Sequence, residues 1–441
     1  MLRIGATLAL GLSARYKLRM STVTQGTVNG AQGRMRLQRV VSALLEHGTM
    51  SRTALAELTG SSQSAMTGSI RLLMSLGHVI ETGRGRSTGG RRRTLLEFDR
   101  RSVLLMLLSV DSRHLVARQV DLAGTVHVQV RRRLDPDQPL ASVLNAIDAL
   151  QSVAESPSTC AVISLPGVVS ADGDVSLAPA LGRPTARRIQ DVVAESSGLH
   201  TIGENDVNLL ALGEARSGAA RDVRDFGLIF VGDGIGGALV LDGRIHRGVS
   251  GSAGEIGFLP WNGALTGGGG AVGPLEAQWS VSALRMRAEE IGVEADEAHV
   301  VEALEASDAP EAGALLDAAM DAWAYAGVVL TCVINPGRIV FAGDAARLSG
   351  TARAALAAKV RAGSPSPIEI CFAELGENAI VSGAIAHLQN DPWIFLPDDD
   401  EARGRRELVS SGAPTPTDPA PGPDPDHATN SEASTHTGPE A

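Results

Sequence analysis

The sequence is poor in cysteine, in lysine and in long apolar runs, and each shortage narrows the class of protein. Its three cysteines, Cys160, Cys332 and Cys371, lie far apart and form no Cys-x-x-Cys pair. This spacing argues against a disulfide scaffold or a cysteine-rich zinc module and favours the cytoplasm. No apolar run approaches the roughly 18 residues of a membrane span, so we expect no membrane partner. Only two of the 39 basic residues are lysine, a bias that we attribute to codon usage.

The composition that remains is globular, but its charge is unevenly distributed. The chain has 441 residues, 44% apolar and 20% charged, which excludes a wholly disordered, collagenous or coiled-coil protein. Residues 1–101 hold sixteen basic and five acidic residues, a net charge of +11, whereas the whole chain carries −11. A basic head before an acidic body is typical of a polyanion-binding module fused to a domain that does not touch the polyanion. Chance clustering of surface arginines is the alternative.

Both ends of the chain are weakly patterned. Residues 1–33 hold a short apolar stretch, Ile4 to Leu12, which is too short for a secretory signal, and Met20 offers a second start. Residues 398–441 contain ten acids, three arginines and no aromatic residue. Such a segment buries too little apolar area to offset chain entropy, so we predict a disordered, acidic, proline-rich tail over residues 396–441.

Residues 34–100 follow the pattern of three helices and a hairpin. Apolar residues recur at helical spacing from Arg34 to His47, a short helix lies between Ser51 and Gly60, and a third runs from Ser62 to Leu76. The residues predicted to face inward on the third helix are Met66, Ile70, Leu73 and Met74. A strand beginning near Val79, an Arg- and Gly-rich tip and a strand from Thr94 to Phe98 follow. This order predicts a winged helix-turn-helix.

A winged helix-turn-helix predicts double-stranded operator DNA as a partner. The N-terminal residues of its second helix meet base edges in the major groove, where glutamine bonds adenine bidentately, and wing arginines suit phosphates or a narrow minor groove. A protein–protein module is the alternative. The candidate DNA-binding residues are Ser62, Gln63, Ser64, Thr67, Arg71, Arg84, Arg86, Arg91, Arg92 and Arg93.

Residues 102–395 alternate strands and helices. A β-rich start followed by βα units predicts an α/β domain with a mixed sheet. The predicted strands are Val103–Val110, His114–Asp121, Thr125–Arg131, Cys160–Leu165, Leu199–Ile202 and Phe226–Val231, and the predicted helices are Leu140–Ala154, Ala186–Ser196 and Val207–Arg216. Asp172-Gly173 marks a hairpin turn.

Several segments of the chain resemble, in the same order, those of ROK-family repressors. They are the wing "STGGRRR", then "ISLPGVV", "ENDVNLLALGE", "GDGIGGALVLDGRIHRGVSGSAGEIG" and "INPGRIVFAG". That family joins sugar kinases and sugar-responsive repressors on one actin-like ATPase fold. The resemblance covers residues 34–395 and implies a two-lobed, ribonuclease H-like domain behind the winged helix. It also implies a homodimer or a dimer of dimers.

The resemblance implies an effector site for a sugar or a sugar phosphate. Asn205, Asp206, Glu255 and Glu276 match the family's sugar-contacting positions. In kinase members the residue matching Asp206 is the general base of phosphoryl transfer. Asp206 as a helix N-cap, and both glutamates as solvated loop acids, are the alternatives.

The phosphate end departs from the kinase pattern. Where kinase members have Asp-x-Gly-Gly-Thr, this chain has Asp111 to Leu115 without glycine, and Asp233 stands where the family usually has threonine. A carboxylate about 4 Å from a phosphate charge costs roughly 4 kcal/mol at an effective dielectric of 20. Asp344 and two alanines follow Gly343, where glycines are usual. We therefore expect no ATP cofactor, no catalytic residue and no enzyme activity.

The zinc ligands that accompany many members are also missing. Phe258 replaces the histidine after "GEIG", and Leu259 to Leu275 contain neither cysteine nor histidine, so we expect no metal. The sequence thus predicts a cytoplasmic, sugar-sensing repressor of carbohydrate genes. The alternative is an active ATP-dependent sugar kinase with an added DNA-binding domain. Arg113 and His114 raise the further possibility of a phosphorylated effector.

Overall fold

The computed structural model describes residues 31–84, 94–111, 113–170, 173, 175–177, 181, 183–263, 265, 272–295 and 299–396. The predicted tail beyond residue 396, the N-terminal 30 residues, and the predicted DNA contacts Arg86, Arg91, Arg92 and Arg93 lie outside these ranges.

Residues 31–98, here called the head, form three helices and a small sheet. The elements are α2 (Ala31–His47), β1 (Met50–Ser51), α3 (Arg52–Thr59), α4 (Gln63–Ser75), β2 (Val79–Arg84) and β3 (Thr94–Phe98). Ser51 caps α3, and Gly60 ends it in the left-handed conformation that glycine adopts without strain. β3 pairs with both β1 and β2 in an antiparallel sheet. The predicted winged helix-turn-helix pattern is therefore present.

One predicted core position of the head is wrong. Met66, Ile70 and Leu73 are buried as expected, but Met74 is 37% exposed, and Ser69 takes a buried position. Residues 66, 69, 70 and 73 share one face of a helix, whereas residue 74 lies about 100° further round from Leu73.

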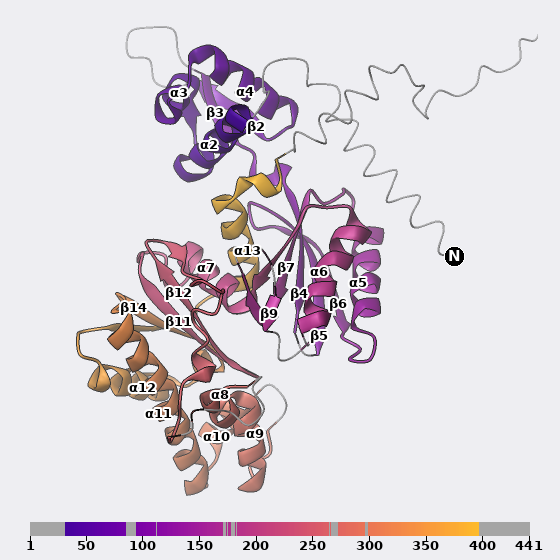
Figure 1. The fold of residues 1–441 in the computed structure, drawn as a ribbon. Coiled ribbons are helices and arrows are strands. Elements are labelled where there is room, and N and C mark those ends of the chain that lie inside the picture. Colours follow the sequence, from indigo (N-terminus) through magenta and orange to yellow (C-terminus); the bar gives the residue numbers. More distant parts are fainter. Residues whose placement is uncertain are drawn as a thin grey trace, which may run out of the picture. The chain divides into compact units, whose positions relative to one another are not determined.

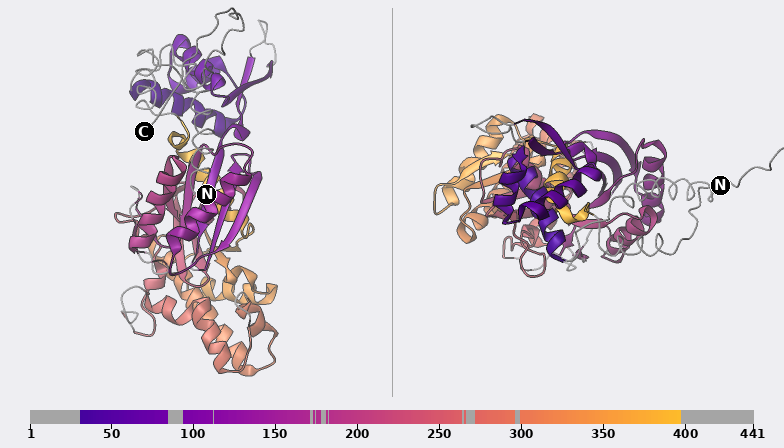
Figure 2. Two further views of the ribbon diagram at one scale, coloured as in Figure 1. Left: turned by 90° about the vertical axis from the view of Figure 1, so that its right-hand side faces the viewer. Right: turned by 90° about the horizontal axis from the view of Figure 1, so that it is seen from above.

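The first lobe is a five-stranded mixed sheet covered on one face by two helices (Figures 1 and 2). Its order is β10-β7-β4-β5-β6, with β4, β7 and β10 parallel and β5 and β6 antiparallel to their neighbours. α5 and α6 pack on the sheet through Ile147 and Ile189, against Met106 and Ile163. The elements of the first lobe are η1 (Arg100–Ser102), β4 (Leu104–Val110), β5 (His114–Asp121), β6 (Val126–Arg133), α5 (Pro139–Val153), β7 (Cys160–Leu165), β8 (Val168–Val169), β9 (Val175–Leu177), α6 (Arg183–Ser197) and β10 (Thr201–Asn205).

The second lobe repeats this topology. Its order, β15-β14-β11-β12-β13, again has three parallel strands followed by two antiparallel ones. α11 and α12 pack on one face of this sheet and α7 on the other. The elements are α7 (Asp206–Ser217), β11 (Phe226–Val231), β12 (Ile235–Leu241), β13 (Arg244–Ile245), η2 (Ile256–Phe258), α8 (Pro274–Trp279), α9 (Val281–Glu290), α10 (Val300–Ala306), α11 (Pro310–Val333), β14 (Arg338–Gly343), η3 (Asp344–Arg347), α12 (Gly350–Gly363) and β15 (Glu369–Phe372). Two lobes with one topology are what the predicted actin-like fold requires.

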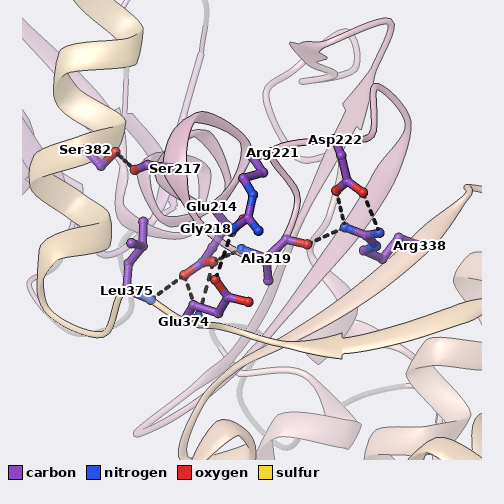
Figure 3. A network of polar contacts seen from close by, with 10 residues as sticks. All are labelled: Glu214, Ser217, Gly218, Ala219, Arg221, Asp222, Arg338, Glu374, Leu375 and Ser382. Atoms are coloured by element: carbon purple, nitrogen blue, oxygen red, sulfur yellow. Dashed lines mark hydrogen bonds and ion pairs between the residues drawn. The ribbon is translucent and has the colours of Figure 1, made fainter.

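Two helices, α7 and α13 (Asn378–Asn390), cross in close contact. A Cβ at Gly213 of α7 would overlap the backbone of Ala379, and one at Gly383 of α13 would overlap that of Leu209. Figure 3 shows how the end of α7 is fixed: the buried Glu214 carboxylate accepts hydrogen bonds from the backbone N–H groups of Ala219, Glu374 and Leu375. Ser217 and Ser382 bond across the two helices. A last short turn, η4 (Pro392–Ile394), follows α13.

One helix, α11, is long and apolar enough to cross a membrane by length and composition. It was not foreseen from sequence, because Asp317 and Asp321 interrupt its apolar run. More than half of its most apolar window is buried inside the second lobe, which is the pattern of a core helix.

Candidate functional site

The candidate site begins where β10 runs directly into α7. The predicted strand, Leu199–Ile202, ends too early: β10 continues to Asn205, and α7 begins at Asp206. The proposed N-cap role of Asp206 is also wrong. Asn205 is the N-cap, because its Oδ1 accepts the N–H of Asn208 and its amide donates to the carbonyl of Gly167. Both ends of the Asn205 amide therefore serve local structure.

Because Asn205 caps the helix, Asp206 keeps one carboxylate oxygen available for a ligand. Its Oδ1 accepts the N–H of Val207, and Oδ2 makes no hydrogen bond within the described residues. Burial raises the pKa of Asp206 to about 6, and the nearby charge of Asp111 raises it further against the opposing bond from Val207. A half-buried carboxyl in this state can accept a hydrogen bond from a ligand hydroxyl, or donate one.

Close backbone packing holds Glu255 near Asp206. Gly254 has φ +98°, and a Cβ there would overlap the backbone of Gly237 in β12. A Cβ at Gly257 would lie 2.6 Å from the carbonyl oxygen of Ile235. The segment 254–257 therefore lies directly against the β12 backbone, which only glycine permits. The side chain of Glu255 makes no hydrogen bond or ion pair in the part of the chain that the structure describes.

Glu276, in the first turn of α8, supports the same region. Its Oε2 accepts the N–H of Ile235 at 3.0 Å and lies 3.1 Å from where a Cβ of Gly234 would be. Burial raises the pKa of Glu276, and the bond from Ile235 opposes that shift. Burial, then Glu276 and Asp206, raise the pKa of Glu255 to about 7. Asp206, Glu255 and Glu276 thus form one electrostatically coupled group.

In the turn between β4 and β5, where kinase members bind phosphate, the backbone N–H groups are bonded within the turn itself. Asp111 Oδ1 accepts the backbone N–H groups of Arg113 at 2.7 Å and His114 at 2.5 Å. A phosphate-binding turn needs such N–H groups directed at the ligand. Here a carboxylate already occupies them. His114 Nδ1 also lies 3.8 Å from Asp111.

Two further carboxylates lie at one end of the second sheet. Asp233 and Asp344 follow β11 and β14, whose last residues, Val231 and Gly343, are directly paired. Asp233 accepts a hydrogen bond from Ser282 at 3.1 Å and lies 4.0 Å from Arg285. Burial raises the pKa of Asp344 to about 6; Arg347 opposes the shift, while Glu302 and Asp233 add to it.

The head presents part of the predicted DNA-binding set on its surface. Ser62 is the N-cap of α4, with its hydroxyl accepting the N–H of Ala65, and Thr67 donates to the carbonyl of Gln63. Gln63, Ser64 and Arg71 are exposed. Arg84 ends β2, and the other wing arginines lie outside the described residues.

Phe258, which stands in place of the family's histidine after "GEIG", is 39% exposed. Within the described ranges, no group of three or more His, Cys, Asp or Glu side chains is arranged to hold a metal ion.

Sequence reasoning missed one pair beside the site. Glu204, one residue before Asn205, is buried and bonded bidentately to Arg247. β10 (TIGEN) holds a single large apolar residue, so the local sequence gives no signal that Glu204 is buried; its partner Arg247 lies 43 residues later in the chain.

Two lobes of one topology, with carboxylates gathered on glycine-rich turns, define the class as a sugar-kinase-like protein of the actin-like fold behind a winged helix-turn-helix head. The ROK family model matches residues 113–391. The chain belongs to the ROK family.

Comparisons with individual proteins support the same assignment. The xylose repressor of Bacillus subtilis (strain 168) is 27% identical over 228 residues, which cover 50% of this chain and 59% of that repressor. Among solved structures, a ROK family transcriptional regulator homologous to the E. coli Mlc protein matches with a TM-score of 0.70 at 22% identity, over 82% of this chain and 97% of that one. A ROK hexokinase from Thermus thermophilus matches with a TM-score of 0.55 at 23% identity, over 66% of this chain and all of that one.

Proposed function

We propose that this protein is a cytoplasmic transcriptional repressor of carbohydrate genes, whose kinase-like body senses a sugar without phosphorylating it. The observation that carries the proposal is the contrast between the two ends of the site. Asp206 and Glu255 retain carboxylate oxygens without partners among the described residues, while the turn amides of Arg113 and His114 are already bonded to Asp111. A polyol can be bound at the first end, whereas at the second end the backbone N–H groups of Arg113 and His114 are not available to a nucleotide phosphate.

The charge of the site favours a neutral sugar over a sugar phosphate. Asp111 and Asp206 interact electrostatically, and Glu255 and Glu276 add two further acids. The His114 ring, which could otherwise offset a phosphate charge, lies 3.8 Å from the Asp111 carboxylate. A phosphate dianion near this group would be repelled.

The kinase alternative rests on one observation, the retained Asp206. Its raised pKa, about 6, suits a general base that works near neutral pH. Against it stand two acids at the end of the second sheet: Asp233, where the phosphates of a nucleotide are expected, and Asp344, where the adenosine side is expected. Arg285 lies close enough to Asp233 to offset part of that charge, but it also fixes Asp233 in place.

A continuous buried cluster connects the site to the head. Leu209 lies in the first turn of α7, three residues after Asp206. It belongs to the same buried cluster as Ile385 of α13, Phe395 after η4, and Leu44 in α2 of the head. Arg100 also donates to the carbonyl of Leu45 in α2 at 2.8 Å. Sugar-driven closure of the two lobes around Asp206 and Glu255 would move α7 and α13 and so change the position of the head. In a two-fold dimer, the two heads would then no longer match an inverted-repeat operator.

The test is release of DNA by sugar. A duplex selected from a random-sequence library by the full-length protein is labelled, and its binding is followed by fluorescence anisotropy during titration with neutral pentoses and hexoses, D-xylose included. We expect one sugar to weaken DNA binding about tenfold or more, which is about 1.4 kcal/mol of coupling. Asp206→Asn should abolish this response, and Asp148→Asn, an exposed acid on α5, should retain it. Unchanged DNA affinity with every sugar would refute the proposal.

A further inference from the structure

One buried ion pair joins the two lobes beside the candidate site. Glu204, on β10 of the first lobe, is 2% exposed and accepts from Arg247 at 2.8 and 2.5 Å, one bond to each carboxylate oxygen. The same carboxylate accepts the N–H of Asn205 and the side-chain amide of Asn208, and His387 of α13 lies 3.5 Å away. Oε1 of Glu204 thus accepts three hydrogen bonds, and Oε2 accepts one from Arg247 with His387 nearby.

Arg247 begins the segment that ends at Glu255. Within residues 247–255, Gly248, Gly251 and Gly254 all have positive φ, so the backbone is intrinsically free to adopt many other conformations. Val249, between them, is fully exposed. The segment therefore needs fixed points at its ends to hold one geometry.

Three contacts provide these fixed points. Gly254 lies against β12 of the second lobe, as described above, and a Cβ at Gly251 would lie 2.9 Å from the carbonyl oxygen of Val169 in the first lobe. The third is Arg247 on Glu204, which lies two residues before Asp206 in the chain. One end of the segment is therefore attached to β10, the strand that leads directly into Asp206, and the other end carries Glu255.

We propose that the Glu204–Arg247 pair is a positioning device that fixes the separation of Asp206 and Glu255, and with it the affinity for the sugar. That the ligand is a sugar rests on the proposed function, but the positioning of segment 247–255 by the Glu204–Arg247 pair can be tested without a ligand. Removal of one partner leaves the other charge buried and unpaired, so the segment 247–255 would leave its position on β10. Gly254 and Gly257 would still hold Glu255 against β12, but the separation of Glu255 from Asp206 would no longer be fixed through Glu204.

The test combines two measurements on the full-length chain. Hydrogen exchange of the backbone amides of residues 248–257 should accelerate about tenfold or more in Glu204→Gln and in Arg247→Met, without sugar present. Arg247→Lys, which keeps the charge but loses the bidentate geometry, should give a smaller increase. The Kd for the sugar that releases DNA should rise about tenfold in Glu204→Gln, and the double variant Glu204→Gln/Arg247→Met should be no worse than the single ones.

Arg338→Met is the matched control. Arg338 is also a buried arginine, paired with Asp222 and Glu369, but it starts β14 at the end opposite Asp344 (Figure 3 draws its bonds to Asp222). The Arg338→Met variant should have a lower thermal stability than the wild type, but its hydrogen exchange at residues 248–257 and its Kd for the sugar should be unchanged. Unchanged exchange in both Glu204→Gln and Arg247→Met would overturn the proposal, as would accelerated exchange with an unchanged Kd. If the wild type binds no sugar, the proposed function fails. The hydrogen exchange of residues 248–257 in the variants and the wild type then decides by itself whether the Glu204–Arg247 pair positions the segment.

Discussion

Glu255 lies near two other carboxylates, Asp206 and Glu276, and no described residue forms an ion pair with it. A pKa of about 7 leaves this side chain divided between its neutral and charged forms at physiological pH. The neutral form donates a hydrogen bond and both forms accept one, so the group suits a sugar hydroxyl, which does the same. The cost of such a site is that the ionised form is poorly solvated and repelled by its neighbours.

That cost predicts a pH-dependent effect of Glu255→Gln. The folded pKa lies above the ordinary value of 4.5, so the bound proton stabilises the fold fully below about 4.5, and this contribution is lost as pH rises through about 7. Glutamine imitates the protonated form at every pH. We therefore expect the variant to match the wild type at pH 4.5 and to be more stable by about 1–3 kcal/mol at pH 8.

Thermal unfolding at half-unit steps of pH measures this difference. Glu155→Gln, at an exposed position after α5, serves as the control and should track the wild type throughout. A loss of stability in Glu255→Gln that is the same at pH 4.5 and pH 8 would mean that the carboxylate makes a structural contact instead.

At the scale of elements, the sequence predicted most of the head and of the first lobe. Ser51 and Ser62 are N-cap signals and Gly60 is a C-cap signal, each with a local physical cause; α3 begins after Ser51 and ends before Gly60, and α4 begins after Ser62. β1 was missed because two residues carry no periodicity, and its partner β3 is distant in sequence. The end of β10 was missed for a different reason: Glu204 reads as polar until Arg247, 43 residues later, is placed beside it. Tertiary contacts of this kind are not visible in local patterns.

The same limit applies within the site. Asp206, Glu255 and Glu276 were chosen from motifs, and the structure brings them into one electrostatically coupled group. That both ends of the Asn205 amide are used, and that Asp111 closes its own turn, depends on hydrogen bonds that no spacing rule specifies.

The wing is the element whose role is most open to a direct test. Replacing Arg91, Arg92 and Arg93 with alanine should weaken DNA binding and lower the slope of log K against log salt by about 3, because each lost phosphate contact removes about one unit. Arg131, Arg132 and Arg133, an exposed triplet that ends β6, provide a control with the same loss of charge. Anisotropy titrations between 50 and 200 mM salt, roughly the range over which such slopes are resolved, give both values. Equal slopes for the two triple variants would contradict a phosphate-binding wing.

At the scale of the whole molecule, the head and the first lobe share one buried core. Phe98 and His78 of the head stack at 5.9 Å, and both contact the ring of Phe395, which follows η4. Arg34 of α2 lies over Trp393 at 5.4 Å. α13 connects this junction to the crossing with α7, and α7 begins at Asp206. A continuous buried path therefore connects the site to the head.

A coupled ATP-consumption assay over the same panel of sugars tests the central claim most directly. Because Asp111 occupies the turn amides and Asp233 and Asp344 flank the end of the second sheet, we expect no ATP turnover above the protein-free rate with any sugar, including the one that releases DNA. Sugar-dependent ATP turnover that Asp206→Asn abolishes would contradict the account and make this protein a kinase.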